Sequence, residues 1–496
     1  MKLAFLLLFI LVMIIVGVYS KTRIKSSDDF FLGGRSMGAW MSAFAYGTSY
    51  FSAVIFIGYA GGLGWRFGVS TSWIGIGNAV FGCWLAWKLL ARRTRDITQR
   101  LDARTMPEFF EKRYQSKNMK FIAALVVFIF LVPYTASVYK GLGYIFESAF
   151  GISFNTVVLI MALLTAVYLI LGGYVATAIN DFIQGIIMII GSILMVFFVL
   201  KSPEVGGFSA ALSKLSDLEP GSGSFIPNAS QFIPLMSMVL MTSFGVWGLP
   251  QMVHKFYAIK DEAAIKRGTI ISTLFAFIIG VSAYFTGALG RLFFIENGVA
   301  VMPQNNADMI VPLMLEKALP DALLGIIIVL ILSASMSTLA ALVLVSSSTI
   351  SIDFIKGFVK NDLSDKKTTY YMRFFCIIFV LLSYIMAIFQ SNTIVYLMSL
   401  SWGVVSGMFL GPYVWGIWSR KVTSFGAWAG FIGGGIVIGG YIILQTFGIL
   451  TVDMPIVSTI AMLVSFITVP LASVLGKEMS HEFIEKVFGK VEKTTV

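Results

Sequence analysis

The sequence contains few of the residues that form disulfide frameworks, metal sites or charged surfaces. Its 496 residues include two cysteines and two histidines, and 12% are Asp, Glu, Lys or Arg. Cys83 and Cys376 both lie in apolar segments, which excludes a disulfide framework. Soluble globular domains typically contain about 25% charged residues. The composition therefore excludes both a soluble globular domain and a small disulfide-stabilised one.

Long apolar runs make up most of the chain. Hydrophobic residues account for 57% of it, and repeated runs of about 18 or more apolar residues are typical of membrane helices. We predict an all-α integral membrane protein with about 13 transmembrane helices. The predicted spans are 2–19, 39–60, 69–90, 121–147, 155–173, 181–200, 232–253, 268–292, 321–349, 371–389, 393–418, 424–447 and 454–475.

Basic residues are distributed unevenly between the connections of these spans. All but seven of the 36 Lys and Arg residues lie in one set of alternate connections. The positive-inside rule places that set in the cytoplasm. We therefore expect a multi-pass protein of the cell membrane with its N-terminus outside and its C-terminus inside. The net charge of +11 follows from this asymmetry, so no nucleic-acid partner is expected. The exceptions are Lys2, Arg66, Lys140, Lys201, Lys214, Arg291 and Lys317.

The first span has an alternative interpretation as a secretory signal peptide, because Lys2 precedes an apolar core that ends near the small residue Ser20. Its apolar run is longer than a usual signal core, and the basic residues Lys21, Arg23 and Lys25 follow it. We therefore predict a retained helix.

The longest predicted outer connection, 201–231, separates two blocks of five spans. The first block covers 39–200 and follows an N-terminal helix and cytoplasmic loop at 1–38. The second covers 232–418 and precedes the C-terminal helices and cytoplasmic tail at 419–496. Blocks of five spans enter the membrane from opposite sides, as in an inverted-topology repeat. In such folds the substrate binds near the midplane, where the first helix of each block is broken.

The first span of each block contains residues that suit a break. The segments are Tyr46–Ser52 and Thr242–Pro250, in which Gly or Pro weakens the helix and hydroxyl residues can bond released backbone groups. Each segment alone is a weak signal, because Gly and Pro are common in membrane helices. Their matching positions in opposed blocks strengthen it.

A polar segment, Ser333–Thr338, interrupts an otherwise apolar span. Ala334, Ser337 and Thr338 share one helix face because their spacing is i, i+3, i+4. Two hydroxyls and a carbonyl on one face form half of a site for a small hard cation. The alternative is that each hydroxyl bonds the carbonyl one turn back.

Four motifs follow one another over nearly the whole chain: Phe30–Ser36, Gly172–Tyr174 with Asn180–Gly185, Gly248–Pro250 and Met336–Leu339. Together they resemble the sodium/solute symporter family, which includes the proline, pantothenate, sialic acid and sugar symporters. The resemblance implies a LeuT-type five-plus-five core with extra helices at both ends. It also implies an importer whose partners are sodium, a small organic solute and the lipid bilayer, and we expect the monomer to be functional. Sodium is the coupling ion, with no other metal or cofactor.

The resemblance implies a shared sodium site of two carbonyls in the broken first core helix and a carbonyl plus two hydroxyls in the eighth. Every one of these ligands offers oxygen and none carries a formal charge, which suits a monovalent ion that must also leave. The matching positions are Thr48, Phe51, Ala334, Ser337 and Thr338.

Asp181 is a further candidate, as a group that helps sodium leave towards the cytoplasm. The alternative is a helix cap, because a carboxylate also suits a helix N-terminus. In some relatives the matching Asp joins a second sodium site with two Ser residues. Here those positions are Ala340 and Ala341, so we predict one sodium ion per cycle.

The candidate substrate residues lie on the two broken helices and the third core helix. Each aromatic among them has core packing as an alternative role. Tyr134 matches a substrate-contacting Tyr of proline symporters, and the absence of an Arg there argues against sialic acid. The candidates are Ser49, Tyr50, Ser52, Phe56, Tyr134, Thr242, Val246 and Trp247.

The resemblance narrows the substrate class without naming one solute. Tyr50 stands where proline symporters carry an Asp, whereas the segments 48–58, 260–268 and 287–291 look closer to pantothenate symporters. We expect a small carboxylate such as pantothenate or another monocarboxylate. The alternative is proline or another amino acid.

Two other classes of protein are considered. An enzyme is disfavoured because His254 and His481 lie at or beyond span ends, with no metal-ligand cluster or nucleophile–base pair in the sequence. A channel or sensor is a remote alternative.

Lys140 lies within a span, where it either snorkels to the outer water layer or attracts an anion or acts in gating.

Overall fold

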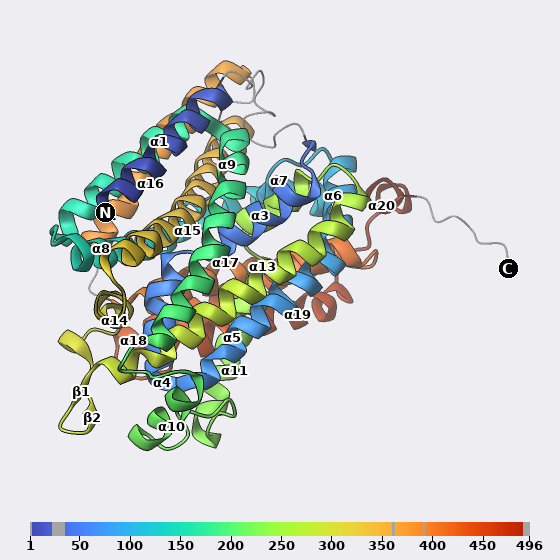
Figure 1. The fold of residues 1–496 in the computed structure, drawn as a ribbon. Helices are drawn as coiled ribbons and strands as arrows, with labels where there is room; N and C mark the ends of the chain where they lie inside the picture. Colours follow the sequence, from blue (N-terminus) through green and yellow to red (C-terminus); the bar gives the residue numbers. More distant parts are fainter. Residues whose placement is uncertain (1, 22–34, 360–362, 390–391, 490–496) are drawn as a thin grey trace.

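The computed structural model describes residues 2–21, 35–359, 363–389 and 392–489, and it is almost entirely helical (Figure 1). Most of the Phe30–Ser36 motif and the side chains of residues 168–176 lie outside the described part. The helices are α1 (Lys2–Lys21), α3 (Ala39–Tyr50), η2 (Val54–Tyr59), α4 (Ala60–Phe67), η3 (Gly68–Thr71), α5 (Ser72–Gly77), η4 (Asn78–Leu85), η5 (Trp87–Ala91), α6 (Arg92–Arg100), α7 (Met106–Tyr114), α8 (Lys117–Phe150), α9 (Phe154–Lys201), α10 (Phe208–Leu218), α11 (Ala229–Gly245), α12 (Pro250–Tyr257), α13 (Glu262–Ala288), η6 (Leu289–Phe293), η7 (Pro303–Asn305), η8 (Ala307–Met309), α14 (Ile310–Ala318), α15 (Asp321–Ser348), η9 (Thr349–Val359), α16 (Asp365–Phe389), α17 (Ile394–Trp418), α18 (Ser424–Thr446), α19 (Met454–Ser473) and α20 (His481–Phe488). One short antiparallel hairpin joins β1 (Ile295–Glu296) to β2 (Val299–Ala300).

Within the described part, ten helical stretches are long and apolar enough to cross a membrane, and two shorter apolar stretches accompany them at Lys2–Met13 and Phe154–Val167. This confirms the predicted fold class. Two pairs of predicted spans are joined in the helical assignment. The helical assignment is uninterrupted over Val54–Arg100, from the second half of the first core helix into its successor, although the chain turns at Gly68 between them. α9 runs over 48 residues. Its length of about 72 Å, at 1.5 Å per residue, exceeds twice the thickness of the hydrocarbon core of a bilayer.

Both predicted breaks are present. α3 ends at Tyr50, Phe51 is extended with φ −106° and ψ 123°, and the helical path resumes at Val54. α11 ends at Gly245 and α12 begins at Pro250, whose fixed φ suits the first helical position. The first core helices of both blocks are therefore pairs of half-helices.

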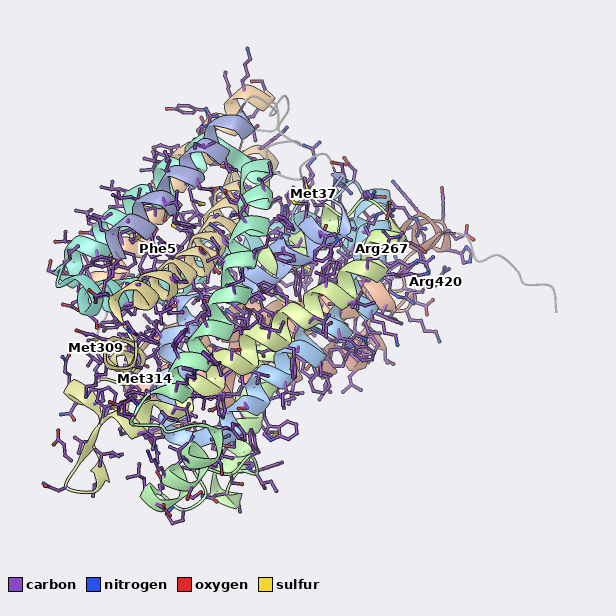
Figure 2. The ribbon with its side chains drawn as sticks, viewed as in Figure 1. Phe5, Met37, Arg267, Met309, Met314 and Arg420 are labelled. Atoms are coloured by element: carbon purple, nitrogen blue, oxygen red, sulfur yellow. The ribbon has the colours of Figure 1, made fainter. Side chains whose placement is uncertain are left out.

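The connections lie at two opposite ends of the bundle. Figure 2 shows Arg267 and Arg420 at one end with Met37, and Met309 and Met314 at the other. We call the end with α20 the tail side and the end with α10 and the β1–β2 hairpin the loop side (Figure 1). The polar segment of α15 lies between these ends and is buried throughout.

On the loop side, the first core helix turns sharply into the next at Gly68. Gly68 has φ +60°, and a Cβ there would meet the Ser222 carbonyl oxygen. The Val69 N–H donates to the same Ser222 oxygen at 2.9 Å. The connection between α9 and α11 is thereby fixed to the turn above the first broken helix.

Lys140 and Asp308 fix the start of α17 on the loop side. The Ile394 N–H donates to Asp308 Oδ2 at 3.1 Å, and Lys140 Nζ donates to the Asn392 carbonyl at 2.6 Å. Lys140 is 3% exposed, so the expectation that it snorkels to water is wrong. Its ammonium is held instead by the backbone that precedes α17 and by attraction to Asp308.

Burial raises the pKa of the Asp308 carboxyl to about 6, against the opposing effects of the Ile394 N–H and Lys140. The folded protein therefore binds a proton between about pH 4 and 6 that the unfolded chain releases. This stabilising contribution is fully present below the unfolded pKa and is lost as the pH rises through about 6.

Lowering the pH from 7 to 5 should stabilise the wild type relative to Asp308→Asn by on the order of 1 kcal/mol. The check is the melting temperature of both proteins in detergent across this range, and a constant difference contradicts it.

Candidate functional site

The polar segment of α15 faces the broken end of α3. Thr338 Oγ1 lies 3.3 Å from the Thr48 carbonyl oxygen and 3.4 Å from that of Ser49. It also lies 3.1 Å from the Ala334 carbonyl one turn back. The Thr338 hydroxyl therefore bonds the carbonyl one turn back in its own helix, as the structural interpretation predicts. It also faces the carbonyls of the break, as the cation-site interpretation predicts.

Ser337 extends this set of oxygens. Its hydroxyl lies 2.8 Å from Thr48 Oγ1 and 2.5 Å from Asp181 Oδ1. Thr48 Oγ1 itself donates to the Phe44 carbonyl at 2.8 Å, so its lone pairs face Ser337. The structure thus brings Thr48, Ala334, Ser337 and Asp181 together from three helices.

The break in α3 makes backbone oxygen available here. The last carbonyls of a helix lack intrahelical partners, and in α3 these include Thr48 and Ser49. The Phe51 N–H still bonds the Gly47 carbonyl at 3.2 Å, and the Ala53 N–H donates to Ser335 Oγ at 3.1 Å. Ser335 therefore holds the start of the second half-helix against α15, with Phe51 extended between the two halves.

Asp181 forms an ion pair that the sequence analysis missed. Lys255 Nζ lies 3.4 Å from Asp181 Oδ2, and the two side chains are 4% and 2% exposed. Lys255 is in the last turn of α12, after the second break. No sequence motif marks Lys255 as the partner of Asp181, because the pairing depends on how α9 and α12 pack.

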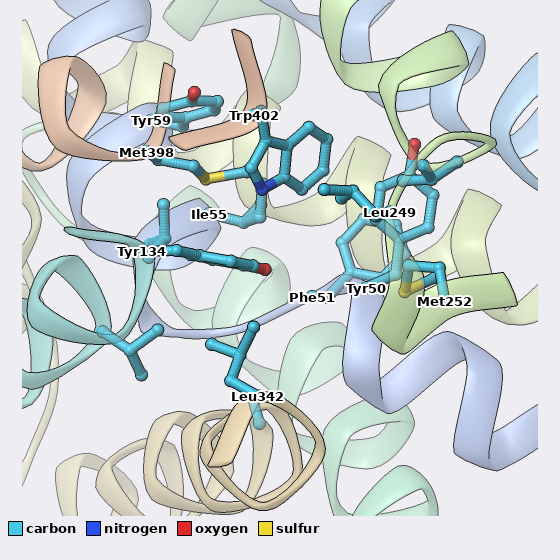
Figure 3. Close-up of a cluster of buried hydrophobic side chains, with 14 of the residues drawn as sticks. Tyr50, Phe51, Ile55, Tyr59, Tyr134, Leu249, Met252, Leu342, Met398 and Trp402 are labelled. Atoms are coloured by element: carbon cyan, nitrogen blue, oxygen red, sulfur yellow. The ribbon is translucent and has the colours of Figure 1, made fainter. Parts of the chain in front are cut away.

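A second group of buried side chains lies between the half-helices, α8 and α17. Figure 3 shows Tyr134 and Trp402 pointing toward one another, with Tyr50 and Leu249 across from them. The rings of Tyr134 and Trp402 lie 5.8 Å apart in a T-shaped arrangement, and those of Tyr50 and Trp402 lie 6.4 Å apart. We call Tyr50, Tyr134, Leu249 and Trp402 the central aromatic cluster.

The second break is held close to this cluster. The Tyr50 hydroxyl donates to the Thr242 carbonyl at 2.6 Å, and Ser406 Oγ donates to the Gly245 carbonyl at 2.6 Å. A Cβ on Gly248 would lie 3.0 Å from the backbone of α17. A glycine at this position therefore lets the break approach α17 closely.

The predicted substrate residues do not all join the cluster. Trp247 donates its indole N–H to the Phe81 carbonyl at 3.0 Å and lines an apolar cavity of about 200 Å³ with residues of α11, α17 and α19. The Thr242 hydroxyl lies 2.8 Å from Asn78 Oδ1. Ser52 Oγ accepts the Val54 N–H at 3.2 Å. Phe56 and Val246 are buried, and the buried Ser49 hydroxyl has no hydrogen-bond partner among the described residues.

The sequence analysis missed Trp402 and Leu249. Leu249 stands within the Gly248–Pro250 motif, which the sequence indicates as a helix break and a family motif but not as part of a substrate site. Trp402 belongs to α17, an apolar helix with no substrate signal of its own. Only the packing of α17 against α8 and α3 brings the Trp402 ring to this position.

A separate cavity lies on the loop side. It has a volume of about 200 Å³ and is lined by residues of α4, α11, α17 and α19, including Leu63, Met238 and Tyr396. Arg66 Nη1 and Asp453 Oδ2, which also line it, form an ion pair of 2.7 Å at its rim.

Paired half-helices around a buried polar site define the class of secondary transporters with the LeuT-like fold. Two solved structures share this fold. One is a substrate-bound outward-open state of a Na+-coupled sialic acid symporter, with a TM-score of 0.77 and 18% identity over 97% of this chain and 99% of that one. The other is the nucleobase-cation-symport-1 family transporter MHP1, with a TM-score of 0.54 and 13% identity over 93% and 98%.

The sequence profile of the sodium:solute symporter family matches residues 30–434, and the chain belongs to this family. It is 30% identical to the sodium/proline symporter of Salmonella typhimurium over 87% of this chain and 85% of that one. It is 30% identical to the Escherichia coli sodium/proline symporter, over 89% and 87%. It is 28% identical to the sodium/pantothenate symporter of Haemophilus influenzae, over 88% of each. The protein is a sodium-coupled solute symporter of the membrane and not an enzyme.

The central cluster leads to a prediction with a matched control. Replacing Trp402 by Ala removes the ring that packs on Tyr134 and Tyr50, and losses of this kind cost about 1–2 kcal/mol. The apparent affinity for the transported solute should fall about tenfold. Trp247→Ala removes an indole outside the cluster and should leave this affinity unchanged. Solute-concentration dependence of uptake into proteoliposomes measures both, and equal effects of the two variants contradict the assignment.

Proposed function

We propose that the coupling sodium ion binds between α3 and α15, coordinated by the carbonyls of Thr48, Phe51 and Ala334 and the hydroxyls of Ser337 and Thr338. The observation that carries this proposal is the position of Thr338 Oγ1, 3.3 Å from the Thr48 carbonyl and 3.4 Å from the Ser49 carbonyl, both released at the break. Uncharged oxygen ligands suit a monovalent ion that must also dissociate. One sodium ion is coupled to each solute molecule, and Asp181 assists its departure.

The proposed solute is a small organic carboxylate such as pantothenate or another monocarboxylate, bound at the central aromatic cluster. Tyr134 and Trp402 supply hydrogen-bond donors, and the positive end of the half-helix that begins at Val54 favours an anion. The named cluster residues include no carboxylate to pair with an ammonium group, which favours a carboxylate over an amino acid.

Proline is the second candidate, because two sodium/proline symporters are each 30% identical to this chain. The identity of 28% to a pantothenate symporter is nearly equal. The two candidates differ physically at the amine, since proline is zwitterionic and pantothenate has no ammonium group.

The proposed orientation in the cell membrane places the loop side outside and the tail side, with most of the basic residues, in the cytoplasm. The N-terminus is then outside and the C-terminus is cytoplasmic. The blocks 39–200 and 232–418 form the two inverted halves, joined by the outer connection 201–231 and flanked by 1–38 and 419–496. Solute enters through the loop-side cavity. The monomer is the functional unit.

The sodium site is tested by the double variant Ser337→Ala with Thr338→Ala. Each lost hydroxyl contact to a charged partner costs about 1.5–3 kcal/mol, so the apparent sodium affinity should fall at least about hundredfold. Ser333→Ala is the control, because its hydroxyl is on the same helix, is buried and has no hydrogen-bond partner among the described residues. Uptake by the double variant with the sodium dependence of the wild type refutes the site.

The solute class is tested by thermal shift. Pantothenate, simple monocarboxylates and proline are added to the purified protein in sodium and in potassium. A carboxylate without an amine should raise the melting temperature in sodium alone, because a ligand that binds only the folded state stabilises it. A sodium-dependent shift with proline and none with the other carboxylates favours the second candidate.

A further inference from the structure

A buried ion pair adjoins the proposed sodium site. Lys255 Nζ and Asp181 Oδ2 are 3.4 Å apart, with side chains 4% and 2% exposed. Ionisable groups inside a membrane are costly, and they are typically retained for a role in transport. The interpretation of Asp181 as an N-terminal cap does not fit, because α9 runs helically on both sides of it.

The ion pair is connected to the sodium site through one side chain. Asp181 Oδ1 lies 2.5 Å from the Ser337 hydroxyl, which is 2.8 Å from Thr48 Oγ1. A hydroxyl has one proton and two lone pairs. When its proton is donated to Asp181, the lone pairs of Ser337 are free to coordinate the proposed sodium ion. Asp181 therefore orients the hydroxyl of a proposed sodium ligand.

The surroundings of Asp181 suit an ammonium better than a free metal ion. One turn beyond Ser337, α15 presents the buried residues Ala340 and Ala341, whose methyl groups offer no oxygen. Hard cations need several oxygen ligands, whereas a Lys ammonium brings three donors and is held by its own chain. Lys255 is also in the last turn of α12, where a positive charge is favourable.

We propose that Lys255 is a tethered cation that permanently occupies the place beside Asp181, so that a second free monovalent cation cannot bind there. Lys255 thereby sets the coupling at one sodium ion per cycle. This inference rests on the proposed sodium site. Without the ammonium, the buried Asp181 carboxylate would lose its counter-charge and would attract a free sodium ion. Because Ala340 and Ala341 add no oxygen, that second ion would bind more weakly than the first.

The test counts sodium ions bound to the full-length protein in detergent, by equilibrium binding of radioactive sodium. The wild type and Lys255→Arg should each bind one equivalent, because both keep a tethered cation. Lys255→Met should bind two. The neutral-pair variant Lys255→Met with Asp181→Asn should bind one, since it removes the carboxylate that attracts the extra ion. One equivalent in Lys255→Met overturns the proposal.

A failure of the sodium site itself gives a different result. If the wild type binds no sodium, or if Ser337→Ala with Thr338→Ala still binds one equivalent, the proposed sodium site is wrong and the tether proposal fails with it. One equivalent in the wild type, none in that double variant and one in Lys255→Met leaves the sodium site intact and overturns the tether alone.

A second measurement covers the case in which Lys255→Met is unstable. Lys255→Ala leaves a space the size of the lost ammonium arm beside Asp181. Methylammonium should raise its melting temperature, whereas tetramethylammonium, which has no N–H donor, should not. The wild type should respond to neither. A Lys255→Ala protein that methylammonium fails to stabilise overturns the proposal.

Discussion

A backbone carbonyl that loses its helical partner inside a membrane must find a donor or a cation, because lipid offers neither. The broken end of α3 creates this need, and α15 meets it with the Thr338 hydroxyl at 3.3 and 3.4 Å from two released carbonyls. Ser335 bonds the start of the next half-helix. Because both halves of the first core helix depend on α15, a movement of either half changes the oxygen positions available to sodium.

The same constraint links the proposed sodium site to the proposed solute site. Tyr50, the last residue of α3, donates its hydroxyl to the Thr242 carbonyl near the second break, and its ring faces Trp402. Only three residues separate Thr48, at the proposed sodium site, from Ser52, which bonds the start of the next half-helix. An ion that orders this segment also orders the central aromatic cluster, which is a physical route for coupling sodium to solute.

The charged groups inside the protein are arranged as buried partners. Lys255 pairs with Asp181 near the proposed sodium site. On the loop side, Lys140 bonds the backbone before α17 and Asp308 accepts the Ile394 N–H. Each group acts on the end of a half-helix or a core helix. These helix ends must move when the solute site opens alternately to the two sides of the membrane. Separating the buried charges during such a movement is costly.

The sequence by itself determined the membrane class, the two breaks and the polar face of α15, because hydropathy, Gly and Pro placement and helical spacing are local properties. Its family motifs also pointed to Thr48, Ser337 and Thr338, which the fold brings together. Tertiary structure alone decided the partners. It turned Trp247 away from the cluster, brought Trp402 into it, buried Lys140 instead of letting it snorkel, and paired Lys255 with Asp181. Each of these depends on contacts between helices distant in the chain, and no local pattern encodes which face of a uniformly apolar helix meets which neighbour.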